Sequence, residues 1–414
     1  MTPAARAPAE ASRLHAVDAL RALALLGILA VNIWFFAHPA QLETGMRTHQ
    51  PETPGDQLVS FAVTLVFEAK SYVVFSFLFG LSFVLQWASA HRAGASEVRR
   101  SVRRFITLGA LGVLHGIFLF VGDILLAYAI LGFALLGMRR ISSRRALIIA
   151  AALYAAVSLF LFGMAGAVLL AEGTPGFDEV MPAPGDADAA VSAYTGGLGS
   201  YLGFQFSAYA VVAPSILFGQ GFMALAAFLV GLVVGRSRVL ERIISREVPT
   251  GRLVTVMLGS LAVGLVFSTA AAWLLWGAPG AVSATSGGAD MGTSLLASAL
   301  VLTGGPVQSL SYVIAALLVL RSPTFTWLTR MLAPAGRMSL TNYLGQSVVL
   351  TGIFSALGLG LAGQLQAHQV GLIVVVLWIA QLILSGLWMR RFRTGPLEGP
   401  LRAITYGRTG TAAR

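Results

Sequence analysis

Cysteine is absent from the 414 residues, and charged residues make up only 11% of them. The first absence excludes disulfides, thiolate nucleophiles and metal sites with cysteine ligands. The second excludes an ordinary water-soluble domain, in which about a quarter of the residues are charged. The six histidines are scattered and are nowhere spaced as metal ligands, so the sequence predicts no metal site.

Hydrophobic residues make up 57% of the chain, and the mean hydropathy is +0.80. A membrane-spanning helix needs about 20 mostly apolar residues. About ten stretches qualify, which predicts an all-α, polytopic integral membrane protein. These stretches cover about 18–38, 58–88, 105–121, 123–138, 146–171, 205–234, 253–276, 294–320, 339–362 and 369–389.

The net charge of +11 comes from short arginine clusters that occur in every second loop between the apolar stretches. Because arginine and lysine collect in cytoplasmic loops, this pattern places both termini in the cytoplasm of a bacterium, with the chain in the inner membrane. The expected partner is therefore the lipid bilayer and not nucleic acid, and a homo-oligomer is compatible with the sequence. The predicted regions are a cytoplasmic segment 1–17, a transmembrane bundle 18–389 and a basic cytoplasmic tail 390–414.

The longest predicted extracytoplasmic loop covers about 172–204 and is rich in glycine, proline and acidic residues. This composition argues against a folded domain. Two interpretations remain, a solvated connector with a short amphipathic stretch and a lid.

Polar residues within the first apolar stretch form a candidate site, because polar groups in a bilayer are costly and often functional. Arg21 and Asn32 are eleven residues apart, so they share one helix face about 16 Å apart. Asp18 can pair with Arg21, and His38 lies at the outer end. The alternative is that Arg21 anchors the helix at the interface and that Asn32 bonds to another helix.

The third stretch repeats this spacing with Arg104 and His115. A neutral imidazole survives in apolar surroundings and exchanges protons near neutral pH, so His115 is the best candidate for a general base. Asp123 lies about 80° off the His115 face of an ideal helix, but it can orient a histidine of this or a neighbouring helix. A single interhelical hydrogen bond for His115 and a turn-capping role for Asp123 are the alternatives.

Two further polar groups lie in the second and ninth stretches. Glu68 and Lys70 suggest an internal ion pair, a polar cavity, or a kinked or broken helix. Each is expected to pair with another span, since residues two apart do not face each other on a helix. Asn342 and Gln346 share a helix face four residues apart, which suits either a polar pocket or interhelical hydrogen bonds.

Several segments together resemble the YeiB-like family of bacterial membrane proteins, which contains a domain of unknown function, DUF418. The resemblance covers nearly the whole chain but implies no reaction. The segments are VDALRALALLGILAVNI, KSYVVFSFLFGLSFVLQ, RRFITLGALGVLHGIFLFVGDILLAYAILG, GRMSLTNYLGQSVVLTGIF and GPLEGPLRAITYGR.

The first span also resembles the transmembrane acyltransferase superfamily, which includes the acyltransferase-3 O-acetylases and the heparan-α-glucosaminide acetyltransferases. Arg21 matches the arginine that both groups carry. Asn32 stands where the O-acetylases have histidine and matches the asparagine of the glucosaminide enzymes. His38 is the nearest equivalent of their loop histidine, and the FLFG sequence ending at Gly80 is similar to a helix that places Glu68 and Lys70 near the family's acidic position.

This second resemblance implies an acyl-CoA-dependent O- or N-acyltransferase, with acetyl-CoA or another acyl-CoA as donor and with no bound cofactor. Its acceptor would be a small molecule, a lipid or a glycan. In this hypothesis Arg21 and Arg104 bind the donor's phosphates, His115 or His38 is the general base, and Asn32 stabilises the oxyanion. Arg21, Asn32, Arg104 and His115 would then converge on one cavity open to the cytoplasm. The alternative is a transporter or lipid-handling protein without catalysis, whose substrate path the same polar residues line.

Overall fold

The computed structural model describes residues 8–44, 51–175, 177, 187–279 and 290–407, and within them all regular structure is helical. In chain order the elements are α1 (Pro8–Ala37), α2 (Ala40–Thr44), α3 (Pro54–Val66), α4 (Lys70–Arg92), α5 (Glu97–Phe118), α6 (Leu125–Gly137), α7 (Ser143–Ala171), α9 (Ala187–Thr195), α10 (Leu198–Gly219), α11 (Gly221–Arg236), α12 (Val239–Ile244), α13 (Thr250–Trp276), α14 (Met291–Leu320), the short 3₁₀ helix η1 (Pro323–Phe325), α15 (Thr326–Arg337), α16 (Ser339–Phe354), α17 (Ala367–Arg391) and α18 (Glu398–Tyr406).

Seven helical segments in the described part of the chain are long and apolar enough to cross a membrane. The protein is therefore an all-α membrane protein, as the sequence predicted, whereas the count of about ten spans and the side of each terminus stay predictions. The seven segments are α1 from His15 onward, α3 and α4 taken together, α7, α10, α13, α14 and α17.

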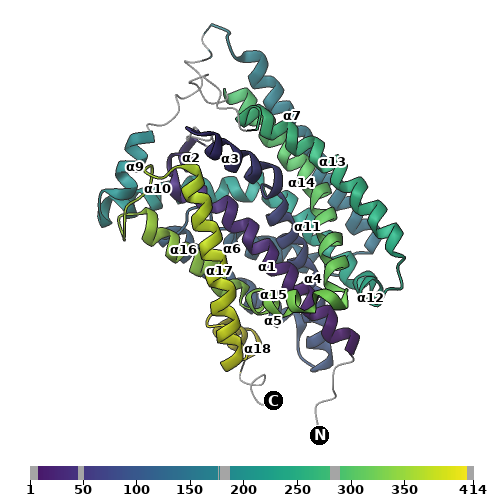
Figure 1. The fold of residues 1–414 in the computed structure, drawn as a ribbon. Helices are drawn as coiled ribbons and strands as arrows, with labels where there is room; N and C mark the ends of the chain where they lie inside the picture. The colour runs from purple at the N-terminus through teal and green to yellow at the C-terminus, as the bar shows by residue number, and fades with distance from the viewer. Residues whose placement is uncertain (1–7, 45–50, 176, 178–186, 280–289, 408–414) are drawn as a thin grey trace.

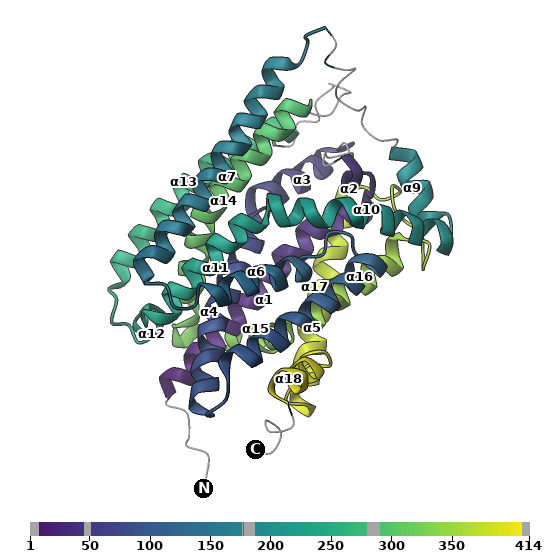
Figure 2. The ribbon, with the colours of Figure 1, turned by 180° about the vertical axis from the view of Figure 1, so that it is seen from behind.

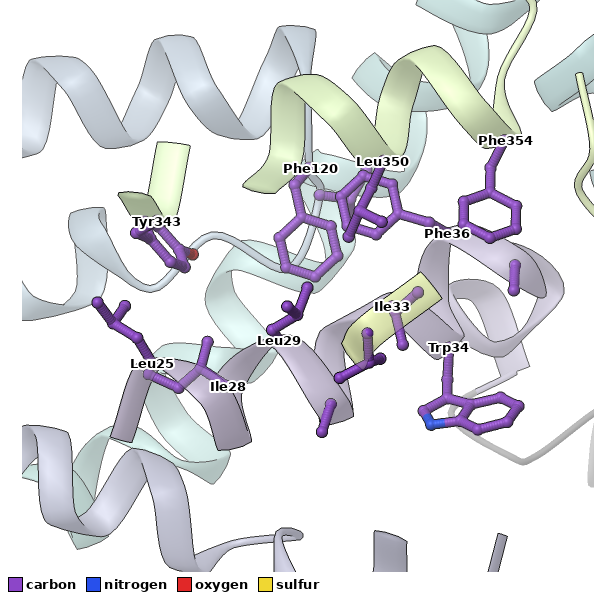
Figure 3. Packing of buried hydrophobic residues seen from close by; sticks show 14 of the residues in the cluster. Leu25, Ile28, Leu29, Ile33, Trp34, Phe36, Phe120, Tyr343, Leu350 and Phe354 are labelled. Carbon is purple, nitrogen blue, oxygen red and sulfur yellow. The ribbon is translucent and has the colours of Figure 1, made fainter. Parts of the chain in front are cut away.

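Helix α1 passes through the middle of the bundle (Figures 1 and 2). In the most hydrophobic 18-residue window of α1, 67% of the residues are buried, against 11% in that of α7. Helix α1 is therefore a core helix, and α7 turns most of its surface to lipid. Leu25, Leu29 and Ile33 of α1 are completely buried. They lie in a cluster that includes Phe120 and Phe354 (Figure 3).

The second predicted span is broken. Helix α3 ends at Val66 and α4 begins at Lys70, and between them Ala69 adopts a left-handed backbone conformation with φ of 62°. The fully buried Lys70 places Nζ 2.8 Å from the carbonyl oxygen of Thr64, one of the carbonyls freed at the end of α3. The expectation that Lys70 pairs with another span is therefore wrong, because the break itself supplies an acceptor.

Three other predicted boundaries also differ. The sixth apolar stretch forms two helices, α10 and α11, which meet at Gln220 shortly after Pro214. The ninth ends at Phe354, before the segment 355–366. Of the predicted loop 172–204, residues 198–204 belong to α10, and Tyr194 of α9 packs against Tyr201 with ring centroids 5.3 Å apart. Residues 176 and 178–186 of that loop lie outside the described part.

Helices α4 and α11 approach through two glycines. A Cβ atom on Gly80 would lie 2.1 Å from the carbonyl oxygen of Phe228, and a Cβ on Gly231 would lie 2.1 Å from that of Phe77. Both contacts are reciprocal between the two helices, so the missing side chains let the backbones touch. This close pair fixes α4, which forms one wall of the site described next.

Candidate functional site

Three buried polar side chains meet between α5, the turn that follows it and α16. His115 Nδ1 lies 2.7 Å from Asp123 Oδ1, and His115 Nε2 lies 2.8 Å from Ser347 Oγ. Each of the three residues is at most 3% exposed. Ser347, His115 and Asp123 thus form a serine–histidine–aspartate triad of the kind that activates a serine hydroxyl.

The turn between α5 and α6 brings Asp123 to His115. Helix α5 ends at Phe118, and Asp123 Oδ2 accepts a hydrogen bond of 2.9 Å from the backbone N–H of Leu126 in the first turn of α6. Gly112 makes room for this turn, because a Cβ there would lie 2.7 Å from Asp123 Oδ2. One oxygen of Asp123 therefore holds the turn and the other holds the imidazole.

The hydrogen-bond partners assign the tautomer of His115. A carboxylate only accepts, so Nδ1 of His115 donates to Asp123. In the neutral imidazole Nε2 is then an acceptor, to which the Ser347 hydroxyl can donate. A serine hydroxyl that donates to a neutral imidazole is in the state from which the imidazole can take its proton.

A cavity of about 380 Å³ lies on the side of α1 where α15, α16 and the C-terminal segment meet. Its outer part is strongly cationic, with five arginines and two carboxylates, and its inner part is apolar. The charged residues are Arg21, Arg104, Arg337, Arg393, Arg402, Asp18 and Glu398, and the inner wall includes Ile28, Phe75, Leu78, Phe79, Leu108, Ile124, Leu125, Tyr128, Leu340 and Tyr343.

Two of these arginines, Arg21 and Arg104, contact side chains of the helix bundle. Arg21 donates from Nη1 to Asp18 Oδ1 and from Nη2 to Ser82 Oγ, both at 2.5 Å. The Arg104 guanidinium lies 5.5 Å from the centroid of the Phe79 ring, and its buried Nε has no hydrogen-bond partner among the described residues. Arg104 thus has a buried donor that the described residues leave unused, and the residue also lines the cavity.

Tyr343 separates the cavity from the triad. Its ring lines the inner wall, and its centroid lies 5.2 Å from that of His115. Figure 3 shows Tyr343 above Leu25 and Ile28 of α1. Ser347 follows Tyr343 by four residues on α16, so the two side chains share one helix face. The triad therefore lies directly behind the inner end of the cavity.

The structure brings some of the predicted site residues together and leaves others apart. Arg21 and Arg104 line one cavity, but Asn32 and His115, which the hypothesis placed in the same cavity, do not line it. His115 and Asp123 lie behind Tyr343 and do not line the cavity. Asn32 is half-buried on α1 and is not part of the lining.

Three further predicted site residues, His38, Glu68 and Lys70, do not line the cavity either. His38 directly follows α1 and stacks on Trp34 with ring centroids 6.2 Å apart. Burial lowers the pKa of His38 to about 4, so its imidazole is neutral at pH 7. Glu68 and Lys70 lie at the break between α3 and α4.

Asn342 and Gln346 join α16 to α17. Asn342 Nδ2 donates to Ser385 Oγ at 3.0 Å, and Gln346 Nε2 donates to Gln381 Oε1 at 2.9 Å. Gln381 Nε2 in turn donates to the Asn342 carbonyl oxygen at 2.9 Å. Of the two interpretations of this pair, the interhelical one matches its observed hydrogen bonds.

Sequence reasoning missed Ser347 and Tyr343. Both lie on the same stretch as Asn342 and Gln346, but serine and tyrosine are ordinary in a membrane helix and need no special explanation there. Ser347 is recognised as a candidate site residue only through its contact with His115, which joins α16 to α5, two helices far apart in the sequence.

Comparison with known proteins gives a partial match to a family model and full-length similarities, but no activity. Residues 250–408 match a family model described as "Protein of unknown function (DUF418)". The chain is 27% identical to the uncharacterized protein YxaH of Bacillus subtilis, over 95% of this chain and 94% of that protein. It is also 27% identical to the uncharacterized protein YeiB of Escherichia coli, over 96% of this chain and 97% of YeiB.

No solved structure matches the chain. The DUF418 match includes Tyr343 and Ser347, whereas His115 and Asp123 fall in the part that only the full-length relatives cover. The site is thus built from both parts of the chain. The family match and the full-length similarities agree, so the chain is similar to YxaH and YeiB over nearly its whole length and matches the DUF418 model over residues 250–408.

Proposed function

We propose that this protein is an acyltransferase of the bacterial inner membrane, which moves an acyl group from cytoplasmic acyl-CoA to a hydroxyl or amine acceptor. The triad of Ser347, His115 and Asp123 carries the proposal. This arrangement is suited to acyl transfer, since the imidazole activates the serine and the carboxylate orients the imidazole.

The reaction divides into two half-reactions. Ser347 Oγ attacks the thioester carbonyl while His115 Nε2 takes the hydroxyl proton, and the C–S bond breaks as that proton passes to the leaving thiolate. The acceptor then attacks the acyl-serine ester while His115 takes its proton and returns it to Ser347 Oγ. The products are free coenzyme A and the acylated acceptor.

The cavity suits the donor in both charge and polarity. Acyl-CoA carries several phosphate groups, and arginine binds phosphate with two parallel hydrogen bonds. The outer part offers five arginines, of which Arg104 keeps an unused buried donor. The apolar inner part, which ends at Tyr343, suits the acyl end of the donor. Tyr343 must turn aside for the thioester to reach Ser347.

The position of the cavity agrees with the proposed topology. Its outer lining comes from Arg337 at the end of α15 and from Arg393 and Arg402 near the C-terminus. In Figure 1 the start of α1 and helix α18 lie at the same end of the molecule. With the basic loops in the cytoplasm, the cavity opens toward the compartment that contains acyl-CoA.

A transporter or lipid-handling protein is the second candidate, favoured by the break between α3 and α4. Broken helices at membrane depth are typical of substrate and ion sites in transporters. In this case the arginine-lined cavity is one end of a path for an amphiphilic anion, and no covalent chemistry occurs.

An acyl-transfer assay in proteoliposomes with labelled acetyl-CoA and a bacterial membrane extract as acceptor source distinguishes the two. We expect labelled product with the wild type, and loss of about 100-fold or more of the rate in His115→Ala. His91→Ala, which changes an exposed histidine near the end of α4, is the matched control and should keep the rate. Full activity in His115→Ala would remove the proposed mechanism. Accumulation of substrate in the vesicles without product would favour the transporter.

A further inference from the structure

Helix α16, which carries Tyr343 and Ser347, lacks an N-terminal cap of its own. The first backbone N–H groups of a helix have no partner within it and need an acceptor from elsewhere. The residue before α16 is Met338, whose side chain makes no capping hydrogen bond. The acceptor comes instead from the far end of the chain.

Glu398 supplies the cap. Its Oε1 accepts from the backbone N–H groups of Leu340 and Thr341 at 2.8 and 3.0 Å. Its Oε2 accepts from the Thr341 hydroxyl at 2.6 Å, and that hydroxyl oxygen accepts from the backbone N–H of Leu397 at 3.1 Å. A carboxylate at this end of a helix also interacts favourably with the helix dipole.

The sequence around Glu398 is built to hold the carboxylate there. A Cβ on Gly395 would lie 2.0 Å from Glu398 Oε2, so only glycine leaves room for it at that position. Just before Gly395, the carbonyl oxygen of Thr394 accepts from Trp388 Nε1 of α17 at 2.9 Å. The GPLEGP sequence at residues 395–400 therefore forms a docking turn for α16.

We infer that Glu398 is a positioning residue, which sets the place of α16 and so holds Ser347 against His115. The inference rests on the proposed function for its effect on turnover. Thr341, the second anchor of Glu398, precedes Ser347 by six residues, or about 9 Å along the helix axis. A helix is stiff over this distance. When the first turn of α16 loses its anchor, the helix can therefore shift as a unit, and Ser347 moves away from Nε2 of His115.

The charge of Glu398 predicts which kinetic constant changes. Glu398 is one of two carboxylates in the lining of the arginine-rich cavity, so its removal makes the cavity more positive. An anionic donor then binds as well as before or better. Glu398→Ala should therefore lower kcat for acyl transfer about 10-fold or more without raising KM for acetyl-CoA. Arginine substitutions in the same cavity should do the opposite and raise KM.

The test combines hydrogen exchange of the peptide covering 339–354 with kinetics in detergent or nanodiscs. In Glu398→Ala we expect exchange at least 10-fold faster for the amides of Leu340 and Thr341, extending to Ser347. Glu398→Gln keeps one acceptor oxygen and should lie between this variant and the wild type. Formate, a free carboxylate small enough for the vacated place, should restore both slow exchange and kcat in Glu398→Ala. Glu247→Ala removes an exposed carboxylate and is the control.

Unchanged exchange of the Leu340 and Thr341 amides in Glu398→Ala would overturn the inference, whatever the activity. A raised KM with unchanged kcat would also overturn it, because Glu398 would then act on the donor and not on α16. If the wild type transfers no acyl group, the proposed function fails, while faster exchange that reaches Ser347 and is reversed by formate still supports the inference about α16.

Discussion

The Ser347 hydroxyl lies 2.8 Å from Nε2 of His115, although the two residues are 232 positions apart in the chain. His115 in turn contacts Asp123, only eight positions away. The triad therefore joins a local pair from the first third of the chain to one serine from the DUF418 region. Loss of either hydrogen bond should lower the rate of acyl transfer, because the rate depends on which ring nitrogen of His115 carries the proton.

Asp123→Asn should lower the rate of acyl transfer about 100-fold to 10,000-fold. The amide of asparagine can donate to Nδ1 of His115, which places the proton on Nε2 and removes the acceptor for the Ser347 hydroxyl. Rate measurements with labelled acetyl-CoA test this. Asp290→Asn is the control, since asparagine can still accept from the Thr293 N–H at the start of α14. Equal rates in both variants would show that the His115 tautomer is irrelevant.

Arg104→Gln should raise KM for acetyl-CoA about 10-fold and change kcat much less, because in the proposed complex Arg104 binds the phosphates of the donor and not its acyl group. High salt should raise KM of the wild type more than that of the variant. The control is Arg252→Gln, an exposed arginine of α13. A loss confined to kcat would contradict the binding role of the cavity.

Gly80→Ala should destabilise the protein by about 1 to 3 kcal/mol, since the added methyl meets a backbone carbonyl that cannot move without the whole of α11. Gly163→Ala adds the same methyl in open space on α7 and should be neutral or stabilise by up to about 1 kcal/mol. Unfolding of the detergent-solubilised variants compares the two. Equal stability of the two variants would mean that α4 and α11 are not in close contact.

His38 should make the protein sensitive to acid. Burial lowers the pKa of His38 to about 4, whereas histidine in an unfolded chain titrates near 6.5. Between these pH values the unfolded chain binds a proton that the folded one does not, so stability falls as the pH falls from 6.5 to 4. The full effect is about 3 kcal/mol and is absent above pH 6.5. In His38→Gln the pH profile of thermal unfolding should be flatter, and identical profiles would refute the assignment.

The sequence predicted the helical class correctly, and seven helical segments of the described part are long and apolar enough to span a membrane, because apolar length alone decides this. It misplaced ends that depend on tertiary contacts. The break at Phe67–Ala69 is held by Lys70 bonding back to Thr64, and α16 ends at Phe354 although the sequence stays apolar for several more residues. Such ends are set by neighbouring helices and not by composition.

Half of the candidate site was also within reach of sequence reasoning. His115 and Asp123 stood out as ionisable residues in apolar surroundings. Their direct contact did not follow from helical geometry, because α5 ends at Phe118 and Asp123 returns through a turn. Ser347 and the cap by Glu398 both depend on which helices meet in space, and one sequence carries no such information.

Detection of an acyl-serine intermediate would decide whether Ser347 is the nucleophile. The purified protein is incubated with acetyl-CoA without acceptor and analysed by peptide mass spectrometry. We expect an acetyl group on Ser347 that is absent in Ser347→Ala and is lost when acceptor is added afterwards. Product formation with Ser347 unmodified, or at an undiminished rate in Ser347→Ala, would contradict the account.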